Sequence, residues 1–103
     1  MRKLAQVLII SCLAGSASFA YADYELLLKS NCTACHYLDK RKYGPKLNEV
    51  AAKYANQTDA VEILAKKIKE GGAGVWGEDM MPPQPQVSAA DALTLAKYIL
   101  SLK

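Results

Sequence analysis

The sequence predicts an all-α fold of about four short helices. Three segments repeat apolar residues at positions i, i+3, i+4 and i+7, which is the spacing of one helix face. We find no convincing alternation of apolar and polar residues of the kind that predicts a half-buried strand. Glycines and prolines gather between residues 71 and 87, where they should keep the chain irregular. The length of 103 residues allows one domain.

Residues 1–22 have the features of a secretory signal peptide. Two basic residues precede an uncharged run, which ends in the A-x-A pattern Ala20-Tyr21-Ala22. We therefore expect cleavage after this pattern, which leaves residues 23–103 as the folded domain. Two alternatives stay open. The run is barely long enough to remain as a membrane anchor, and Cys12 lies in a stretch that resembles a lipoprotein box.

The first helix of that domain is expected to begin with Asp23 as its N-cap and to end near Asn31. Its apolar face is expected to consist of Tyr24, Leu27 and Leu28. A second helix is expected at about residues 47–54. Its repeating apolar positions are Leu47, Val50, Ala51 and Tyr54.

Thr58 is expected to cap the third helix, and the pair Gly71-Gly72 to stop it. The apolar positions of this helix are Val61, Leu64, Ala65 and Ile68. The last helix is expected to open after Ser88 with a variant of the capping box and to end near Leu102. Its apolar positions are Ala92, Leu95, Ala96 and Ile99.

The pentad Cys32-Thr33-Ala34-Cys35-His36 is the C-x-x-C-H attachment pattern for c-type haem. The two thiols are expected to form thioethers with one haem, and His36 to be the proximal ligand of its iron. A zinc site would need four ligands, but His36 is the only histidine in the chain. A thioredoxin-like dithiol would need a β-α-β setting. We therefore expect one covalently attached haem c, around which the short helices pack and which stabilises a domain of marginal size.

A methionine is the expected second axial ligand, because a single histidine excludes bis-histidine ligation within the chain. Met80 and Met81 lie in the proline-rich loop. Met81 is preferred because Pro82 pushes the preceding residue into an extended conformation, although a role for Met80 stays open. An iron with both axial positions filled suits an electron carrier rather than an enzyme.

The charge of the expected domain is close to balanced. Removal of residues 1–22 leaves 11 of the 13 basic residues, against 10 acidic ones. Two haem propionates would bring the total close to neutral, which argues against a nucleic-acid partner. The basic run Lys40-Arg41-Lys42 is interpreted as a solvated loop, with a partner-docking patch as the alternative.

From Asp23 onwards the chain resembles the short class I bacterial cytochromes c of the c-551 type. The resemblance covers essentially the whole expected domain and rests on five motifs. These are Cys-Thr-Ala-Cys-His, Tyr43-Gly44-Pro45, Gly74-Val75-Trp76-Gly77, Met81-Pro82-Pro83 and Leu93-Thr94-Leu95-Ala96-Lys97.

The resemblance implies roles for further residues. The Pro45 carbonyl should accept a hydrogen bond from the His36 ring, and Trp76 should donate its indole N–H to a haem propionate. Lys67 stands where relatives place an arginine on a propionate. The chain also departs from the family at Gln84, where an asparagine is usual, and at Pro85, which adds a residue to the loop.

The resemblance also implies a function: a soluble, monomeric periplasmic one-electron carrier. Its partners would dock at the exposed haem edge, with a donor such as a quinol-oxidising complex and an acceptor such as nitrite reductase or an oxidase. No stable membrane insertion is expected after cleavage. Two alternatives stay open. One is a small haem enzyme or ligand-binding sensor with a displaceable methionine, and the other is a membrane-anchored subunit of a larger redox complex.

Overall fold

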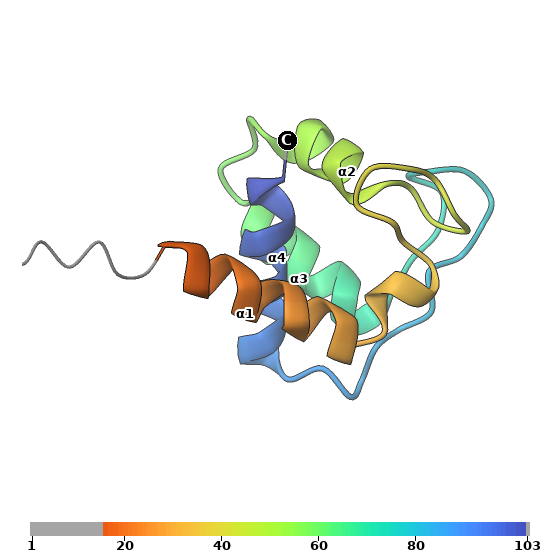
Figure 1. Ribbon diagram of the computed structural model, residues 1–103. Helices are drawn as coiled ribbons and strands as arrows, with labels where there is room; N and C mark the ends of the chain where they lie inside the picture. Colours follow the sequence, from red (N-terminus) through yellow and green to blue (C-terminus); the bar gives the residue numbers. More distant parts are fainter. Residues whose placement is uncertain (1–15, 103) are drawn as a thin grey trace, which may run out of the picture.

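The computed structural model describes residues 16–102, and its regular elements are helical (Figure 1). In chain order they are α1 (Ser16–Lys29), the short 3-10 helix η1 (Cys32–Ala34), α2 (Leu47–Tyr54), α3 (Ala60–Glu70) and α4 (Ala89–Ser101). Within residues 16–102, strand-like pairing is limited to one isolated bridge between Gly72 and Met81. The predicted all-α fold is therefore confirmed. No helix in this described part has the length and apolar character needed to cross a membrane.

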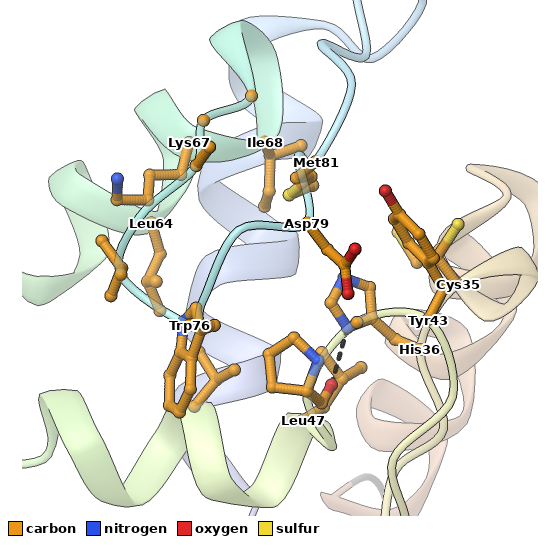
Figure 2. A pocket seen from close by; sticks show the side chains of 18 of the residues that line it. Cys35, His36, Tyr43, Leu47, Leu64, Lys67, Ile68, Trp76, Asp79 and Met81 are labelled. Atoms are coloured by element: carbon orange, nitrogen blue, oxygen red, sulfur yellow. Dashed lines mark hydrogen bonds between the residues drawn. The ribbon is translucent and has the colours of Figure 1, made fainter.

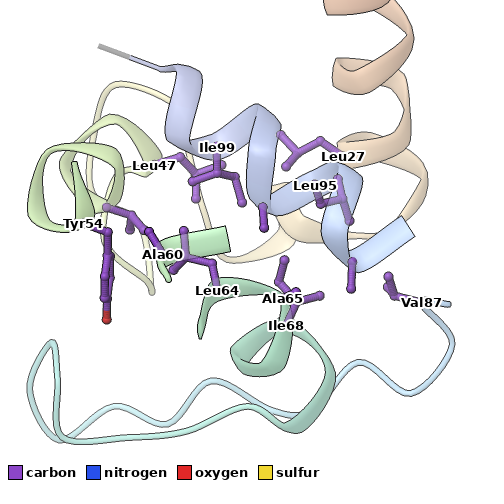
Figure 3. Packing of buried hydrophobic residues seen from close by; sticks show 13 residues of the cluster. Leu27, Leu47, Tyr54, Ala60, Leu64, Ala65, Ile68, Val87, Leu95 and Ile99 are labelled. Carbon is purple, nitrogen blue, oxygen red and sulfur yellow. The ribbon is translucent and has the colours of Figure 1, made fainter. Parts of the chain in front are cut away.

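Helix α4 is the centre of the core, since it packs against α1, α2 and α3 (Figure 3). Leu27 of α1 and Leu95 of α4 are fully buried where the two helices meet. Burial of side chains of this size is worth about 1.5–3 kcal/mol each. The long segments between α1 and α2 and between α3 and α4 lie outside this helical core (Figure 1).

Helices α2 and α4 agree closely with the prediction. Helix α2 spans the expected residues, and its four predicted apolar positions are buried. At the start of α4 the Asp91 amide donates to Ser88 Oγ over 3.1 Å, which satisfies one of the free amides of the first turn. All four predicted apolar positions of α4 are buried as well.

The predicted start of the first helix is wrong. Helix α1 begins at Ser16 and continues through Asp23, because the alanine-rich residues before Asp23 favour helix themselves. The expected cleavage position after Ala22 therefore lies within α1 in this chain, while residues 1–15 of the expected signal peptide are outside the described residues. Leu28 was expected on the buried face but is 43% exposed. Leu27 takes the place facing α4, and the neighbouring residue points about 100° away.

The predicted cap of the third helix is also wrong. Helix α3 starts at Ala60, so Asp59 rather than Thr58 occupies the N-cap position, and its side chain makes no capping bond. The Ala60 amide instead donates to the Gln57 carbonyl over 3.3 Å. A backbone carbonyl in this turn thus accepts the hydrogen bond that a side-chain hydroxyl cap would otherwise accept. Leu64, Ala65 and Ile68 are buried as predicted, and Val61 is partly buried.

Candidate functional site

A hollow of about 1020 Å³, its open mouth included, lies beside the helical core (Figure 2). Its apolar walls include Leu47 and Val50 of α2, Leu64 and Ile68 of α3, and Ile99 of α4. All seven residues that the sequence suggested for a cofactor site line this one hollow. They are Cys32, Cys35, His36, Pro45, Lys67, Trp76 and Met81.

The pentad forms one wall of the hollow through a tight local turn. Asn31, which directly precedes η1, has a φ of 64°. The Cys35 and His36 amides both donate to the Cys32 carbonyl, over 3.2 and 2.9 Å. Both cysteine side chains are half-buried. Burial raises the pKa of the Cys32 thiol, opposed in part by a backbone hydrogen bond. The turn brings two cysteine side chains and an imidazole to the same wall.

The His36 ring is held in one orientation. His36 Nδ1 lies 2.7 Å from the Pro45 carbonyl oxygen, so this nitrogen carries the proton and donates it (Figure 2). The contact is the one that the resemblance implied. A bond of this kind fixes the imidazole tautomer and leaves Nε2 with its lone pair for a metal.

Gly44 provides the space in which that ring lies. A Cβ at this position would be 2.5 Å from His36 Cε1, which is far inside van der Waals contact. The Gly44 amide also donates to the Cys35 carbonyl over 2.7 Å, so the backbone folds back over the pentad. The absence of a side chain at Gly44 therefore allows the ring to lie flat against the chain.

Met81 reaches the hollow from the loop between α3 and α4. Its amide donates to the Gly72 carbonyl over 2.8 Å, and its carbonyl accepts from the Gly72 amide over 3.0 Å. Figure 2 shows Met81 beside Ile68, with its side chain among the lining residues. Met80, in contrast, is 59% exposed and does not line the hollow. The preference for Met81 over Met80 therefore agrees with the position of the two side chains.

Trp76 and Lys67 lie on the opposite side of the hollow from Cys35 and His36 (Figure 2). Both are partly buried. Lys53 of α2 lies with Nζ 5.3 Å from the centroid of the Trp76 ring, which is within the range of a cation–π contact. An indole N–H and an ammonium group on this side are suited to acidic groups of a bound molecule.

The sequence analysis missed the importance of three lining residues and two glycines. Arg41, Tyr43 and Asp79 line the hollow. Arg41 was interpreted as part of a solvated basic loop, Tyr43 served only as part of a motif of the resemblance, and Asp79 was left aside. The pair Gly71-Gly72 was interpreted only as a helix stop. A Cβ on Gly71 would overlap the Met81 carbonyl oxygen. No local pattern signals this contact, because the two residues meet only after the loop between them has folded.

The comparisons with known proteins agree with this geometry. The sequence pattern of the family described as Cytochrome c matches residues 24–103. The chain belongs to the cytochrome c family. Cytochrome c-552 of Nitrosomonas europaea is 52% identical over 87 residues, which is 84% of each chain. Cytochrome c-551 of Azotobacter vinelandii is 49% identical over 79 residues, 77% of this chain and 95% of the relative.

A solved structure supports the same assignment. The crystal structure of wild-type Nitrosomonas europaea cytochrome c552 superposes with a TM-score of 0.76 at 51% identity, covering 78% of this chain and 99% of the other. As a short class I cytochrome c, the protein carries one covalently attached c-type haem and is an electron-transfer protein, not an enzyme.

The residues of the hollow fit a haem. The walls are largely apolar, as a porphyrin face requires, and two thiols stand one helical turn apart on one wall. The imidazole has one nitrogen occupied by Pro45 and the other available. The groups on the far side, Trp76 and Lys67, match the acidic propionates in chemistry. The residues of the hollow thus fit covalent attachment of a haem, axial ligation of its iron and binding of its propionates.

Proposed function

We propose that the protein is a periplasmic one-electron carrier whose haem is attached through Cys32 and Cys35. His36 and Met81 are the two axial ligands of the iron in this proposal. The observation that carries it is that an oriented imidazole and a thioether line one apolar hollow although they come from different segments. When bound, the haem supplies a reversible one-electron iron couple.

The chain's own residues set the conditions for that couple. The bond from His36 Nδ1 to Pro45 keeps the imidazole in one tautomer. It also makes Nε2 more basic, so that Nε2 donates more electron density to the iron. The apolar walls from α2, α3 and α4 exclude water, and this favours the iron state with the smaller net charge. A thioether at Met81 favours ferrous iron more than a second imidazole would, so a relatively high reduction potential is expected.

The partners in this proposal dock where the hollow opens. Tyr43 and Val75 line the hollow and are 48% and 41% exposed, so an apolar edge is accessible there. A quinol-oxidising complex is the proposed donor, and a nitrite reductase or an oxidase the proposed acceptor. We propose that the carrier acts as a monomer, without a nucleic-acid partner, after removal of residues 1–22.

A pair of matched variants tests the ligand assignment. Met81→Ala should abolish the weak long-wavelength sulfur-to-iron charge-transfer band of the oxidised protein, whereas Met80→Ala should leave it. Loss of the band in Met80→Ala alone would show that the assignment is wrong. Rapid binding of carbon monoxide to the reduced parent protein would instead favour a sensor or enzyme with a displaceable methionine.

Two further measurements test the location and the partners. The intact mass of the protein from the periplasm should equal residues 23–103 plus one haem. A longer chain would support the membrane-anchored alternative. Turnover reconstituted with purified nitrite reductase or oxidase should depend on this protein, and an acceptor that is reduced equally fast without it is excluded.

A further inference from the structure

The segment from Gly74 to Met80 covers the hollow next to Met81 but has few attachments to the rest of the molecule. Among residues 22–102, its hydrogen bonds and ion pairs to other segments come from two side chains, those of Tyr43 and Arg41. Both belong to the loop that follows the pentad, and both line the same hollow as Met81. The two loops that flank the hollow are thus connected to each other directly.

The first connection ends on the backbone. Tyr43 donates its hydroxyl to the Met80 carbonyl oxygen over 3.4 Å, across 37 positions of sequence. Because the acceptor is a carbonyl that belongs to the peptide unit joining Met80 to Met81, the bond acts on the chain immediately before Met81. Replacing the Met80 side chain would therefore leave it in place.

The second connection is an ion pair one residue earlier. Arg41 Nη2 lies 3.8 Å from Asp79 Oδ2, and both side chains are more than half exposed. Such a pair is weak and is screened by salt. Together the two contacts hold Asp79 and Met80, the two residues that directly precede Met81.

We propose that Tyr43 and Arg41 are positioning residues that latch the segment Asp79–Met81 against the hollow. The proposal rests on the proposed role of Met81 as an axial ligand. The reciprocal backbone bonds between Gly72 and Met81 form the fixed side of this arrangement, since they are short and paired. The contacts of Tyr43 and Arg41 form the releasable side, because they are long and exposed. The latch sets how often Met81 leaves its position.

The test uses the haem-loaded protein and the variant Tyr43→Phe, which keeps the ring and removes the donor. Tyr37→Phe is the matched control, because Tyr37 lies in the same loop, is 42% exposed and contacts Lys40 and Lys42 rather than the Met81 segment. The first readout is the limiting rate at which added imidazole binds the oxidised protein, which reports the departure of Met81. Tyr43→Phe should raise this rate about two- to tenfold, as expected for one lost hydrogen bond.

The second readout does not depend on the iron ligand. Hydrogen exchange of the Met81 backbone amide, which donates to the Gly72 carbonyl, should become faster in Tyr43→Phe by a similar factor and stay unchanged in Tyr37→Phe. Unchanged exchange and an unchanged imidazole rate in Tyr43→Phe would overturn the latch. Faster exchange in Tyr43→Phe, together with a parent protein that lacks the charge-transfer band, would support the latch and overturn the ligand role of Met81 instead.

The ion pair is tested by its salt dependence. Arg41→Gln should raise the imidazole rate at low ionic strength, and the difference from the parent should vanish at about 1 M salt. Lys40→Gln is the control, since Lys40 is the adjacent cation and contacts Tyr37 instead. An equal effect of Arg41→Gln and Lys40→Gln would show that general charge, and not the pair with Asp79, is responsible.

Discussion

Met81 and Gly72 exchange two backbone hydrogen bonds, at 2.8 and 3.0 Å, and this is the one strand-like pairing within residues 16–102. The pairing begins directly after α3, where Gly71 ends the helix with its amide donating to Lys67. The backbone of the proposed ligand is therefore tied to the end of a core helix. A change at this point should reach the iron without touching the methionine side chain.

The variant Gly71→Ala should displace Met81. Gly71 has a φ of 70°, and an added Cβ would overlap the Met81 carbonyl and lie 2.8 Å from the Pro83 nitrogen. With a ψ of −163°, this backbone conformation is essentially restricted to glycine, so the strain costs about 1–3 kcal/mol, and the overlap adds roughly 1–3 kcal/mol. Denaturant unfolding measures the loss of stability, and the charge-transfer band of the oxidised protein reports the displacement of Met81. Gly74→Ala is the control, since its φ is 93° but its Cβ would meet nothing within 4 Å; it should lose stability and keep the band.

The variant Gly44→Ala should turn the His36 ring away from Pro45. The added Cβ would lie 2.5 Å from the ring, and the resulting overpacking should cost about 1–3 kcal/mol. The haem should stay attached, because both cysteines remain. The ring resonances of His36 in the NMR spectrum of the reduced protein should shift, with a change in reduction potential. If the His36 ring resonances and the reduction potential equal those of the parent, the added Cβ does not displace the ring and this prediction is wrong.

The sequence analysis succeeded where the information is local. The apolar spacing in α2 and α4 located both helices. The preference for Met81 over Met80 stays a proposal, and the 59% exposure of Met80 agrees with it. The prediction failed at Asp23, because a good N-cap residue does not end a helix that the preceding alanines can continue. The roles of Gly71 and Tyr43 depend on contacts between distant segments, which no helical or turn pattern encodes.

The packing of α4 in the core should contribute strongly to stability. Leu95 is fully buried against the core, so Leu95→Ala should lower the free energy of unfolding by about 2–5 kcal/mol (Figure 3). Leu93 lies two positions earlier on the same helix and is 39% exposed. Leu93→Ala should therefore change the free energy of unfolding by no more than about 0.5 kcal/mol. Comparable losses in both variants would contradict the packing described for α4.

Stability should fall at alkaline pH through Tyr98. Burial raises the pKa of this phenol above its usual value of 10.0, and the charges of Tyr24 and Asp23 add to the effect. The native state then binds the proton more tightly than the unfolded state, so stability is lost as pH rises above about 10. Tyr98→Phe should reduce this loss, measured as the difference in unfolding free energy between about pH 9 and about pH 11. An identical decline in parent and variant would exclude Tyr98 as its source.

The wall that carries the pentad depends on contacts between near neighbours in the chain. His36 and Pro45 are nine positions apart, and the Gly44 amide reaches back to Cys35. Met81, by comparison, arrives only when α3 has formed and Gly72 can pair with it. Maturation can therefore proceed in two stages. The haem is first attached to a partly folded chain, and the loop that carries Met81 then folds over it. The turn that presents both cysteines and His36 thus needs no contact with the loop that carries Met81.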